Sequence, residues 1–229
     1  EYRYRGASPK NYVTFNNETW RIIGVFPTDD GTGKIENRIK LIKDQSIGNK
    51  YWDESQTNDW VRPSTLNAEL NGTYLNRLDS IAQSMIGNTK YYLGGYNTAN
   101  IQKDVMYQYE RKINGSTYYN GSNSNNFIGK VALMYASDYG YAASDECTQT
   151  LVNYDNATCK NNNWLYNIKV SEWILPQDAS NSSSAFYVSS GGGVYRSDFY
   201  VIADQFAVRP VLYLTFSAKI TGGSGTSSN

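Results

Sequence analysis

Histidine is absent from this 229-residue sequence, and cysteine occurs only twice. Without histidine the chain lacks the Ser-His and Cys-His pairs of common hydrolases and the histidine-ligated zinc sites. Lys and Arg number 21, as do Asp and Glu, so no net positive charge attracts nucleic acid or an anionic membrane. No apolar run reaches the ~18 residues of a membrane-spanning helix. We therefore expect no nucleic-acid partner, no membrane insertion of this segment and no cofactor.

Aromatic residues, by contrast, are abundant, with 21 Tyr, 7 Phe and 5 Trp. Disordered chains are poor in aromatic residues, so the composition predicts a folded domain with a polar surface. The bias toward Asn, Ser, Thr, Gly and Tyr is typical of extracellular proteins. Because the sequence opens without a signal peptide, we expect a piece of a longer secreted or anchored protein, located outside the cell or on its surface.

The two cysteines, Cys147 and Cys159, lie close together in a polar segment. A disulfide between them would close a short loop and stabilise the fold by about 3 kcal/mol in the chain-entropy model. Two free thiols are the equally weighted alternative. The spacing differs from the Cys-x-x-Cys pattern of redox and zinc sites, so Cys147 and Cys159 are a disulfide candidate and nothing more.

The apolar pattern mixes strands and helices. We predict strands over residues 12–15, 20–26, 39–42, 131–135, 185–189, 194–202 and 208–216. We predict helices over residues 64–78, 78–87 and 99–113, the first broken in two at Asn71-Gly72. With no linker or internal repeat, the pattern favours a single α+β domain over residues 1–220, followed by a Gly/Ser-rich tail or linker over residues 221–229.

Two glycine-rich segments superficially match ligand-binding loops. Gly191-Gly192-Gly193 lies between two predicted strands, which indicates a hairpin turn rather than a phosphate-binding loop. The segment over residues 29–33 has two Asp and two Gly but lacks the closing Glu of a calcium-binding EF-hand. We predict an ordinary turn there and assign no metal ligand and no catalytic residue.

The C-terminal third combines aromatic residues with small polar ones, a composition typical of adaptable binding surfaces. Strand alternation assigns some of these aromatic residues to the core. The predicted ligand-binding face consists of Ser189, Ser190, Tyr195, Arg196, Ser197, Asp198, Phe199, Tyr200, Asp204 and Gln205. The aromatic members would anchor a protein or glycan ligand, and Arg196 and Asp198 would set its polarity.

Four motifs together resemble a group of bacterial surface domains. They are Trp20-Arg21-Ile22-Ile23-Gly24, Asp138-Tyr139-Gly140, Trp164-Leu165 with Trp173-x-x-Pro176, and Val208-Arg209-Pro210-Val211-Leu212. That group has the C-type-lectin-like fold and is similar to the formylglycine-generating enzymes and to the variable proteins of diversity-generating retroelements. The resemblance, over roughly residues 10–220, implies that the early hairpin pairs with the terminal strand and that residues 160–208 build the binding face.

The sequence departs from this group at its functional motifs. It has no Glu-Pro-Asn or Trp-Asn-Asp, the calcium and sugar motifs of animal C-type lectins. Cys147 and Cys159 lie well before the end of the chain, where formylglycine-generating enzymes carry their cysteine pair. Neither calcium-dependent sugar binding nor that oxidase activity is carried over, because function resides in the site and not in the fold.

A codon argument bears on the retroelement resemblance. Diversification of adenines in Asn codons does not produce Lys, Glu, Gln, Met or Trp. The window 179–208 holds one residue of these five types, Gln205, although 36 of the 229 residues belong to them. The polar segment 113–129 holds none either. We interpret that segment as a polar loop. The window 179–208 lies just before Arg209-Pro210, where the resemblance places a variable region, so we expect the variable region there.

We expect a non-enzymatic, extracellular ligand-binding domain, monomeric, that binds a protein or glycan on another cell or molecule. In the sharper version it is a diversified variable protein with its face in residues 179–208. The first alternative is a fixed-sequence structural or adhesion module of a bacterial surface protein. The remote alternative is a formylglycine-generating-like oxidase.

Overall fold

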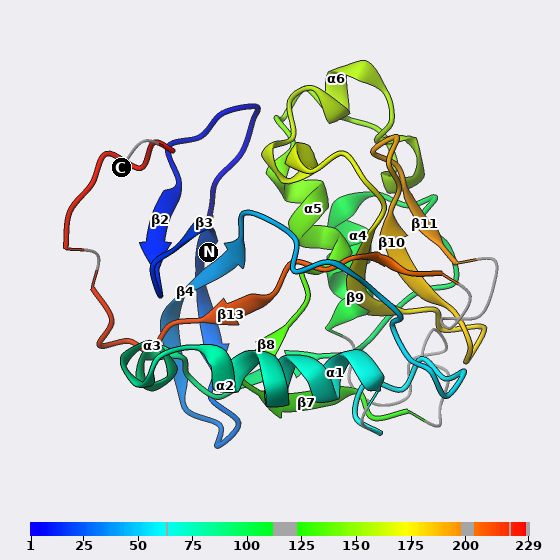
Figure 1. Cartoon of the computed structure of the whole chain (residues 1–229). Helices are drawn as coiled ribbons and strands as arrows, with labels where there is room; N and C mark the ends of the chain where they lie inside the picture. Colours follow the sequence, from blue (N-terminus) through cyan, green and yellow to red (C-terminus); the bar gives the residue numbers. More distant parts are fainter. Residues whose placement is uncertain (63, 112–122, 198–203, 220, 228–229) are drawn as a thin grey trace.

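The structure, a computed structural model, describes residues 1–62, 64–111, 123–197, 204–219 and 221–227. The strands are β1 (Tyr2–Arg3), β2 (Tyr12–Phe15), β3 (Glu18–Asp29), β4 (Ile35–Lys43), β5 (Asn49–Lys50), β6 (Thr89–Tyr92), β7 (Asn126–Gly129), β8 (Val131–Ala132), β9 (Glu172–Gln177), β10 (Ala185–Val188), β11 (Val194–Arg196), β12 (Phe206–Ala207) and β13 (Val211–Tyr213). The α-helices are α1 (Thr65–Glu69), α2 (Leu75–Arg77), α3 (Ser80–Met85), α4 (Lys103–Glu110), α5 (Ala136–Ala142) and α6 (Ala157–Lys160). Single turns of other helix types are η1 (Leu70–Tyr74), η2 (Leu151–Asn153) and η3 (Trp164–Asn167). The mostly antiparallel sheets and short helices make an α+β fold (Figure 1).

The first sheet is built around the hairpin of β3 and β4. Its strand order is β1-β3-β4-β13-β8, and β2 also pairs with β3. The predicted turn over residues 29–33 forms as expected, because the Asp29 carboxylate accepts hydrogen bonds from the backbone N–H groups of Gly31 and Gly33, at 2.8 and 3.0 Å. β13 lies antiparallel to β4, with Val211 opposite Ile42. The early hairpin and the last strand are therefore neighbours.

Gly24, the last residue of the Trp20–Gly24 motif, permits β1 to join this sheet. A Cβ atom at Gly24 would lie 2.0 Å from the backbone oxygen of Tyr2 on β1. No other residue type fits so close an approach of two backbones. The glycine thereby brings Arg3, the other residue of β1, against the interior of the molecule, where its side chain has only 6% exposure.

The second sheet has the order β11-β10-β9-β12-β5, and β6 and β7 form a separate pair. The strand predicted over residues 208–216 is shorter than expected, because its ladder covers Val211–Tyr213. Of the strand predicted over residues 194–202, Val194–Arg196 forms β11, and residues 198–202 lie outside the described residues. The Gly191–Gly193 segment forms the β10–β11 turn, with Gly192 at a positive φ of 102°.

The helical region begins as predicted, with the Ser64 side chain accepting from the backbone N–H of Asn67. The predicted break at Asn71-Gly72 is wrong. The helix continues through η1, a π-helical turn, into α2. Asn71 explains the irregular turn, because its Oδ1 atom accepts from the backbone N–H groups of Lys130 and Val131, at 3.1 and 3.0 Å. The side chain is thus bound to β8 across the turn. Among the described residues, no helix combines the length and apolar character needed to span a bilayer.

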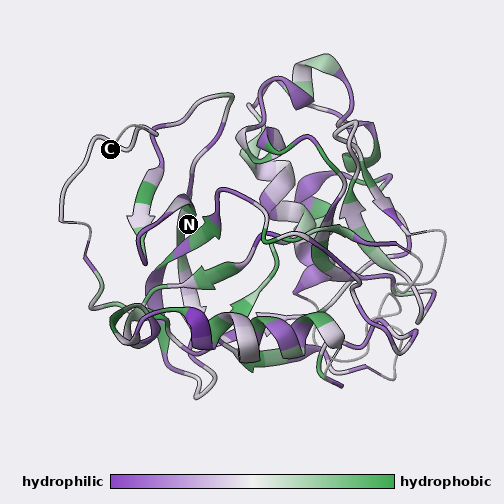
Figure 2. Cartoon of the chain, viewed as in Figure 1, coloured by the Kyte–Doolittle hydropathy of each residue, from purple (hydrophilic) through white to green (hydrophobic). Residues whose placement is uncertain are grey.

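The core fills the space between the sheets and the helices. Hydrophobic residues gather on β4, β13 and β8 at the centre of Figure 2, and the α1–α2 segment mixes hydrophobic with hydrophilic residues. All five Trp side chains are buried, each with 2% exposure or less. Leu214 is buried and Thr215 is not, but Val211, Leu212 and Tyr213 are buried as well, so the last strand is covered on both faces.

Two covalent or ionic links tie the irregular segments to this core. Cys147 and Cys159 form a disulfide, and both are buried. Arg209 donates from Nε and Nη2 to the two carboxylate oxygens of Glu172, at 2.7 and 2.9 Å.

The segment after β13 passes α3 and returns to β2 (Figure 1), where the backbone N–H of Tyr12 donates to Gly225 O at 3.0 Å. The Gly/Ser-rich tail therefore packs on the first sheet.

Candidate functional site

The described residues among those predicted to bind a ligand lie on or beside β10, β11 and β12 of the second sheet. Three of them, Asp198, Phe199 and Tyr200, fall outside the described residues. The described members are Ser189, Ser190, Tyr195, Arg196, Ser197, Asp204 and Gln205. Ser189 and Ser190 begin the β10–β11 turn, and Asp204 and Gln205 precede β12. Because β11 is the edge strand and β12 lies two strands away from β10, the set spans most of the width of the sheet.

Four aromatic side chains form a row across this sheet, which we call the aromatic face: Tyr195 on β11, Tyr187 on β10, Trp173 on β9 and Phe206 on β12. Tyr187 lies opposite both Tyr195 and Trp173 in the strand register. The ring centroids of Tyr187 lie 6.2 Å from Tyr195 and 4.6 Å from Phe206. Those of Trp173 and Phe206 are 4.5 Å apart. The rings therefore form a continuous aromatic surface.

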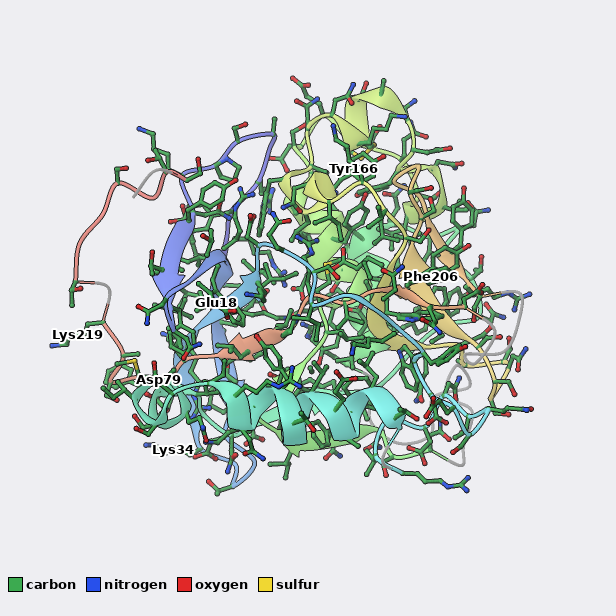
Figure 3. All side chains as sticks on the ribbon, in the orientation of Figure 1. Glu18, Lys34, Asp79, Tyr166, Phe206 and Lys219 are labelled. Atoms are coloured by element: carbon green, nitrogen blue, oxygen red, sulfur yellow. A yellow bond between two sulfur atoms is a disulfide. The ribbon has the colours of Figure 1, made fainter. Side chains whose placement is uncertain are left out.

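The aromatic face is graded from solvent to core. Tyr195 is 36% exposed, Tyr187 and Phe206 are half-buried, and Trp173 is 1% exposed. Figure 3 shows Phe206 on the right-hand side of the molecule. The Trp173 indole is fixed from behind, because its Nε1 donates to Lys50 O at 2.8 Å. Trp173 thus forms the floor, and the three outer rings are the part that a ligand can reach.

Two predicted residues do not share this face. Arg196 follows Tyr195 on the strand, so its side chain points to the opposite side, where Nη1 donates to Asp178 Oδ2 at 3.1 Å. Ser197 is buried, and its Oγ accepts from the backbone N–H of Ala185 at 3.2 Å. The assignment of Ser197 to an exposed face is therefore wrong, since its hydroxyl holds the β10–β11 ladder together.

The site also contains residues that the sequence did not select. Tyr187, Trp173 and Phe206 were not among the predicted binding residues. The strand period of two places Tyr187 and Tyr195 on one face once their register is known. Trp173 and Phe206 join them through pairing of β9 with β10 and β12, which no local pattern indicates.

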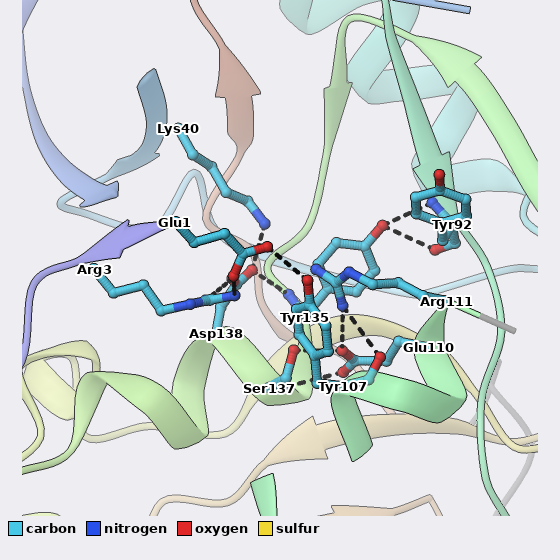
Figure 4. A network of polar contacts seen from close by, with 10 residues as sticks. All are labelled: Glu1, Arg3, Lys40, Tyr92, Tyr107, Glu110, Arg111, Tyr135, Ser137 and Asp138. Atoms are coloured by element: carbon cyan, nitrogen blue, oxygen red, sulfur yellow. Dashed lines mark hydrogen bonds and ion pairs between the residues drawn. The ribbon is translucent and has the colours of Figure 1, made fainter. Parts of the chain in front are cut away.

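A second polar cluster lies inside the molecule, around Asp138 at the start of α5 (Figure 4). Lys40 from β4 and Arg3 from β1 both bind its carboxylate, Arg3 through Nη1 at 3.0 Å. The backbone N–H of Tyr135 donates to the same carboxylate at 2.9 Å. Lys40 also lies 4.5 Å from the centre of the Tyr135 ring. We call this cluster, with the neighbouring Glu110, the Asp138 network.

Burial and charge set the protonation of the Asp138 network. Burial disfavours the charged form of Asp138, but Lys40 and Arg3 outweigh it and hold its pKa below the ordinary value. Burial lowers the pKa of Lys40 to about 8, although Asp138 opposes that change. Burial raises the pKa of Glu110 to about 6, against the charge of Arg111 and the hydrogen bonds from Ser137.

Perturbed pKa values often mark catalytic groups, but they also mark structural ion pairs. The side chains of Lys40, Asp138 and Glu110 are each 0% exposed. Their partners are other residues of the chain. The network is therefore placed to hold β1, β4 and α5 together.

Metal and thiol chemistry find little support in the described residues. No three His, Cys, Asp or Glu side chains of that part group together to hold a metal ion. The disulfide uses both cysteines of the sequence.

The chain matches no protein-family model, no curated protein and no solved structure.

Proposed function

We propose that this chain is a non-enzymatic ligand-binding domain that acts outside the cell. The observation that carries the proposal is the aromatic face, because Tyr195 is exposed, Tyr187 and Phe206 are half-buried, and the Tyr187 ring packs against both of the others. Aromatic side chains offer rigid contact area at a small loss of conformational entropy. A glycan ring or a protein side chain would stack on them.

The proposed location and fold have separate support. Disulfides persist mainly in oxidising compartments, and the buried Cys147–Cys159 bond suits a protein outside the cell. For the fold we propose the C-type-lectin-like architecture, supported by the pairing of the early β3–β4 hairpin with the terminal strand β13. In the sharper version of the proposal, residues 179–208 are diversified. A near-copy of their codons beside a reverse-transcriptase gene, differing at template adenines, would support it.

The test of the aromatic face is a binding screen followed by one substitution. The chain is screened against a glycan array and a panel of displayed extracellular proteins. We expect Tyr195→Ala to weaken binding to the ligand so found by at least about tenfold, as for a removed aromatic hot spot. Because the side chain lies at a sheet edge and is partly exposed, the change in Tm is expected to stay below about 5 °C.

Tyr2→Ala is the matched control, since Tyr2 is an exposed tyrosine, 59% accessible, on an edge strand of the other sheet. It should leave binding unchanged within about twofold. An equal loss for both variants, or no ligand in either screen, would contradict the proposal. The fixed-sequence adhesion module would then become the better description.

A further inference from the structure

A pocket of about 730 Å³ lies away from the aromatic face, where the loop before β2 meets η3 and the C-terminal tail. This volume is within the usual range of small-molecule sites. Its wall includes the aromatic rings of Tyr12, Trp164 and Tyr166. Tyr166, labelled near the top of Figure 3, donates from its hydroxyl to Ser190 O at 2.5 Å. We call this site the Arg21 pocket, after its one buried charged side chain.

Arg21 is 3% exposed, yet it lines the pocket. Its guanidinium carbon lies 4.0 Å from the centre of the Tyr12 ring and 4.5 Å from that of Trp164. Stacked rings cover the faces of a guanidinium and leave its edge for hydrogen bonding. The Nε atom donates to Asn11 Oδ1 at 2.9 Å, and Nη1 lies 3.9 Å from Asp44 Oδ1. The guanidinium is thus held firmly while its Nη atoms make no short bond to a carboxylate among the described residues.

The other charged residues of the pocket wall are all cations, namely Lys10, Lys160 and Lys169. Asp44 stands behind Arg21, so that pair is close to neutral, and the three lysines remain. None of them forms an ion pair with another described residue. In a chain with equal numbers of acidic and basic residues, a pocket lined by cations alone has a positive potential that attracts anions.

We infer that the Arg21 pocket binds the oxyanion of an acidic saccharide, a sugar that carries a carboxylate or a phosphate. The edge of the guanidinium matches the paired oxygens of such a group. The three lysines add charge around it, and the half-buried Tyr166 ring offers an apolar face to the sugar body. The exposed amide of Asn161 lies on the same wall and can bond a sugar hydroxyl. This inference does not depend on the aromatic face.

The test is calorimetric titration of the chain at low salt with three probes. Trigalacturonic acid offers carboxylates, glucose 1-phosphate offers a phosphate, and maltotriose is a neutral saccharide. We expect at least one acidic probe to bind with a Kd below about 10 mM, and maltotriose not to bind. The probe that binds more tightly identifies the source of the oxyanion.

Three variants locate the binding. In the pocket triple variant, Lys10, Lys160 and Lys169 are each replaced by Gln. The control triple variant has the same change at Arg62, Arg77 and Lys219, which are exposed and lie outside the pocket wall. We expect the pocket triple to weaken binding by at least about tenfold and the control triple by less than about twofold. Arg21→Lys, which keeps the charge but loses the fork, should also weaken it about tenfold.

Equal weakening by the two triple variants would overturn the inference, because it would show attraction to the overall charge. Binding of maltotriose as tight as that of the acidic probes would also overturn it, as would the absence of binding by both acidic probes. Should Arg21→Lys unfold, the two triple variants still decide, because their lysines and arginines form no ion pair with the residues that the structure describes. Tyr195→Ala should leave the Kd of the acidic probe unchanged, which separates this site from the aromatic face.

Discussion

The Asp138 network and the Arg21 pocket both gather charge, but they differ in whether the charge is matched. In the network, each buried cation has a carboxylate, and Lys40 and Asp138 are both 0% exposed. In the pocket, three lysines lie near a solvent-open wall without a carboxylate partner among the described residues. Burying charge is unfavourable unless it is paired, so the first arrangement serves the fold. Unpaired cations contribute little to stability and remain available for a ligand.

The strongest way to break the network is Asp138→Asn. The substitution keeps the shape but leaves Lys40 buried without a carboxylate to pair, and leaves Arg3 with Glu1 alone. We expect the free energy of unfolding to fall by about 3–5 kcal/mol, measured by urea denaturation. Asp145→Asn is the control, because Asp145 pairs with Arg5 in the open, where the two side chains are 79% and 41% exposed. It should lower stability by less than about 1 kcal/mol; similar losses for both would refute the role of burial.

The sequence predicted the parts of the fold that depend on near neighbours. The early strands, the start of the helix at residue 64 and the turn over residues 29–33 are each specified by a few adjacent side chains. The Asp138 network could not be predicted in the same way, because Lys40 lies 98 positions and Arg3 lies 135 positions from Asp138 along the chain. Such contacts depend on which strands become neighbours.

The candidate site likewise combines a residue that the local sequence indicates with residues that only the pairing of strands brings together. Tyr195 was selected because the sequence around it is rich in aromatic and small polar residues, and it does lie on the aromatic face. Trp173 and Phe206 reach it only through sheet pairing. Arg196 was included to set the polarity of the face, although strand alternation alone would have separated it from Tyr195. Ser197 was included as well, but it is buried. A stricter use of that period would have corrected one residue of the site.

A smaller effect is expected in the pH dependence of stability, to which Glu110 of the Asp138 network contributes. Because burial raises the pKa of Glu110 to about 6, the protonated form is favoured in the folded state relative to an ordinary value of 4.5. The stabilisation is complete below pH 4.5 and is lost as the pH rises through 6. Relative to Glu110→Gln, the wild-type free energy of unfolding should therefore fall by about 2 kcal/mol between pH 4 and pH 7.

Urea denaturation at the two pH values measures this difference. Glu54→Gln, at an exposed glutamate, is the control and should follow the wild-type pH dependence. If Glu110→Gln also followed it, then Glu110 would titrate with an ordinary pKa, and the network would be open to water.

The smallest effect is expected in the pocket. Replacing Lys10, Lys160 and Lys169 with Gln removes no ion pair recorded among the described residues, so the free energy of unfolding should change by less than about 0.5 kcal/mol. The sign of the change is informative, because removing the repulsion between the three lysines is expected to raise the free energy of unfolding slightly at low salt. Salt screens repulsion between exposed charges over roughly 10 Å at 0.1 M, so the gain should disappear as salt is added. A loss of 2 kcal/mol or more, which is about the effect expected for Glu110, would mean that these lysines hold the fold and that the contrast between the two regions is false.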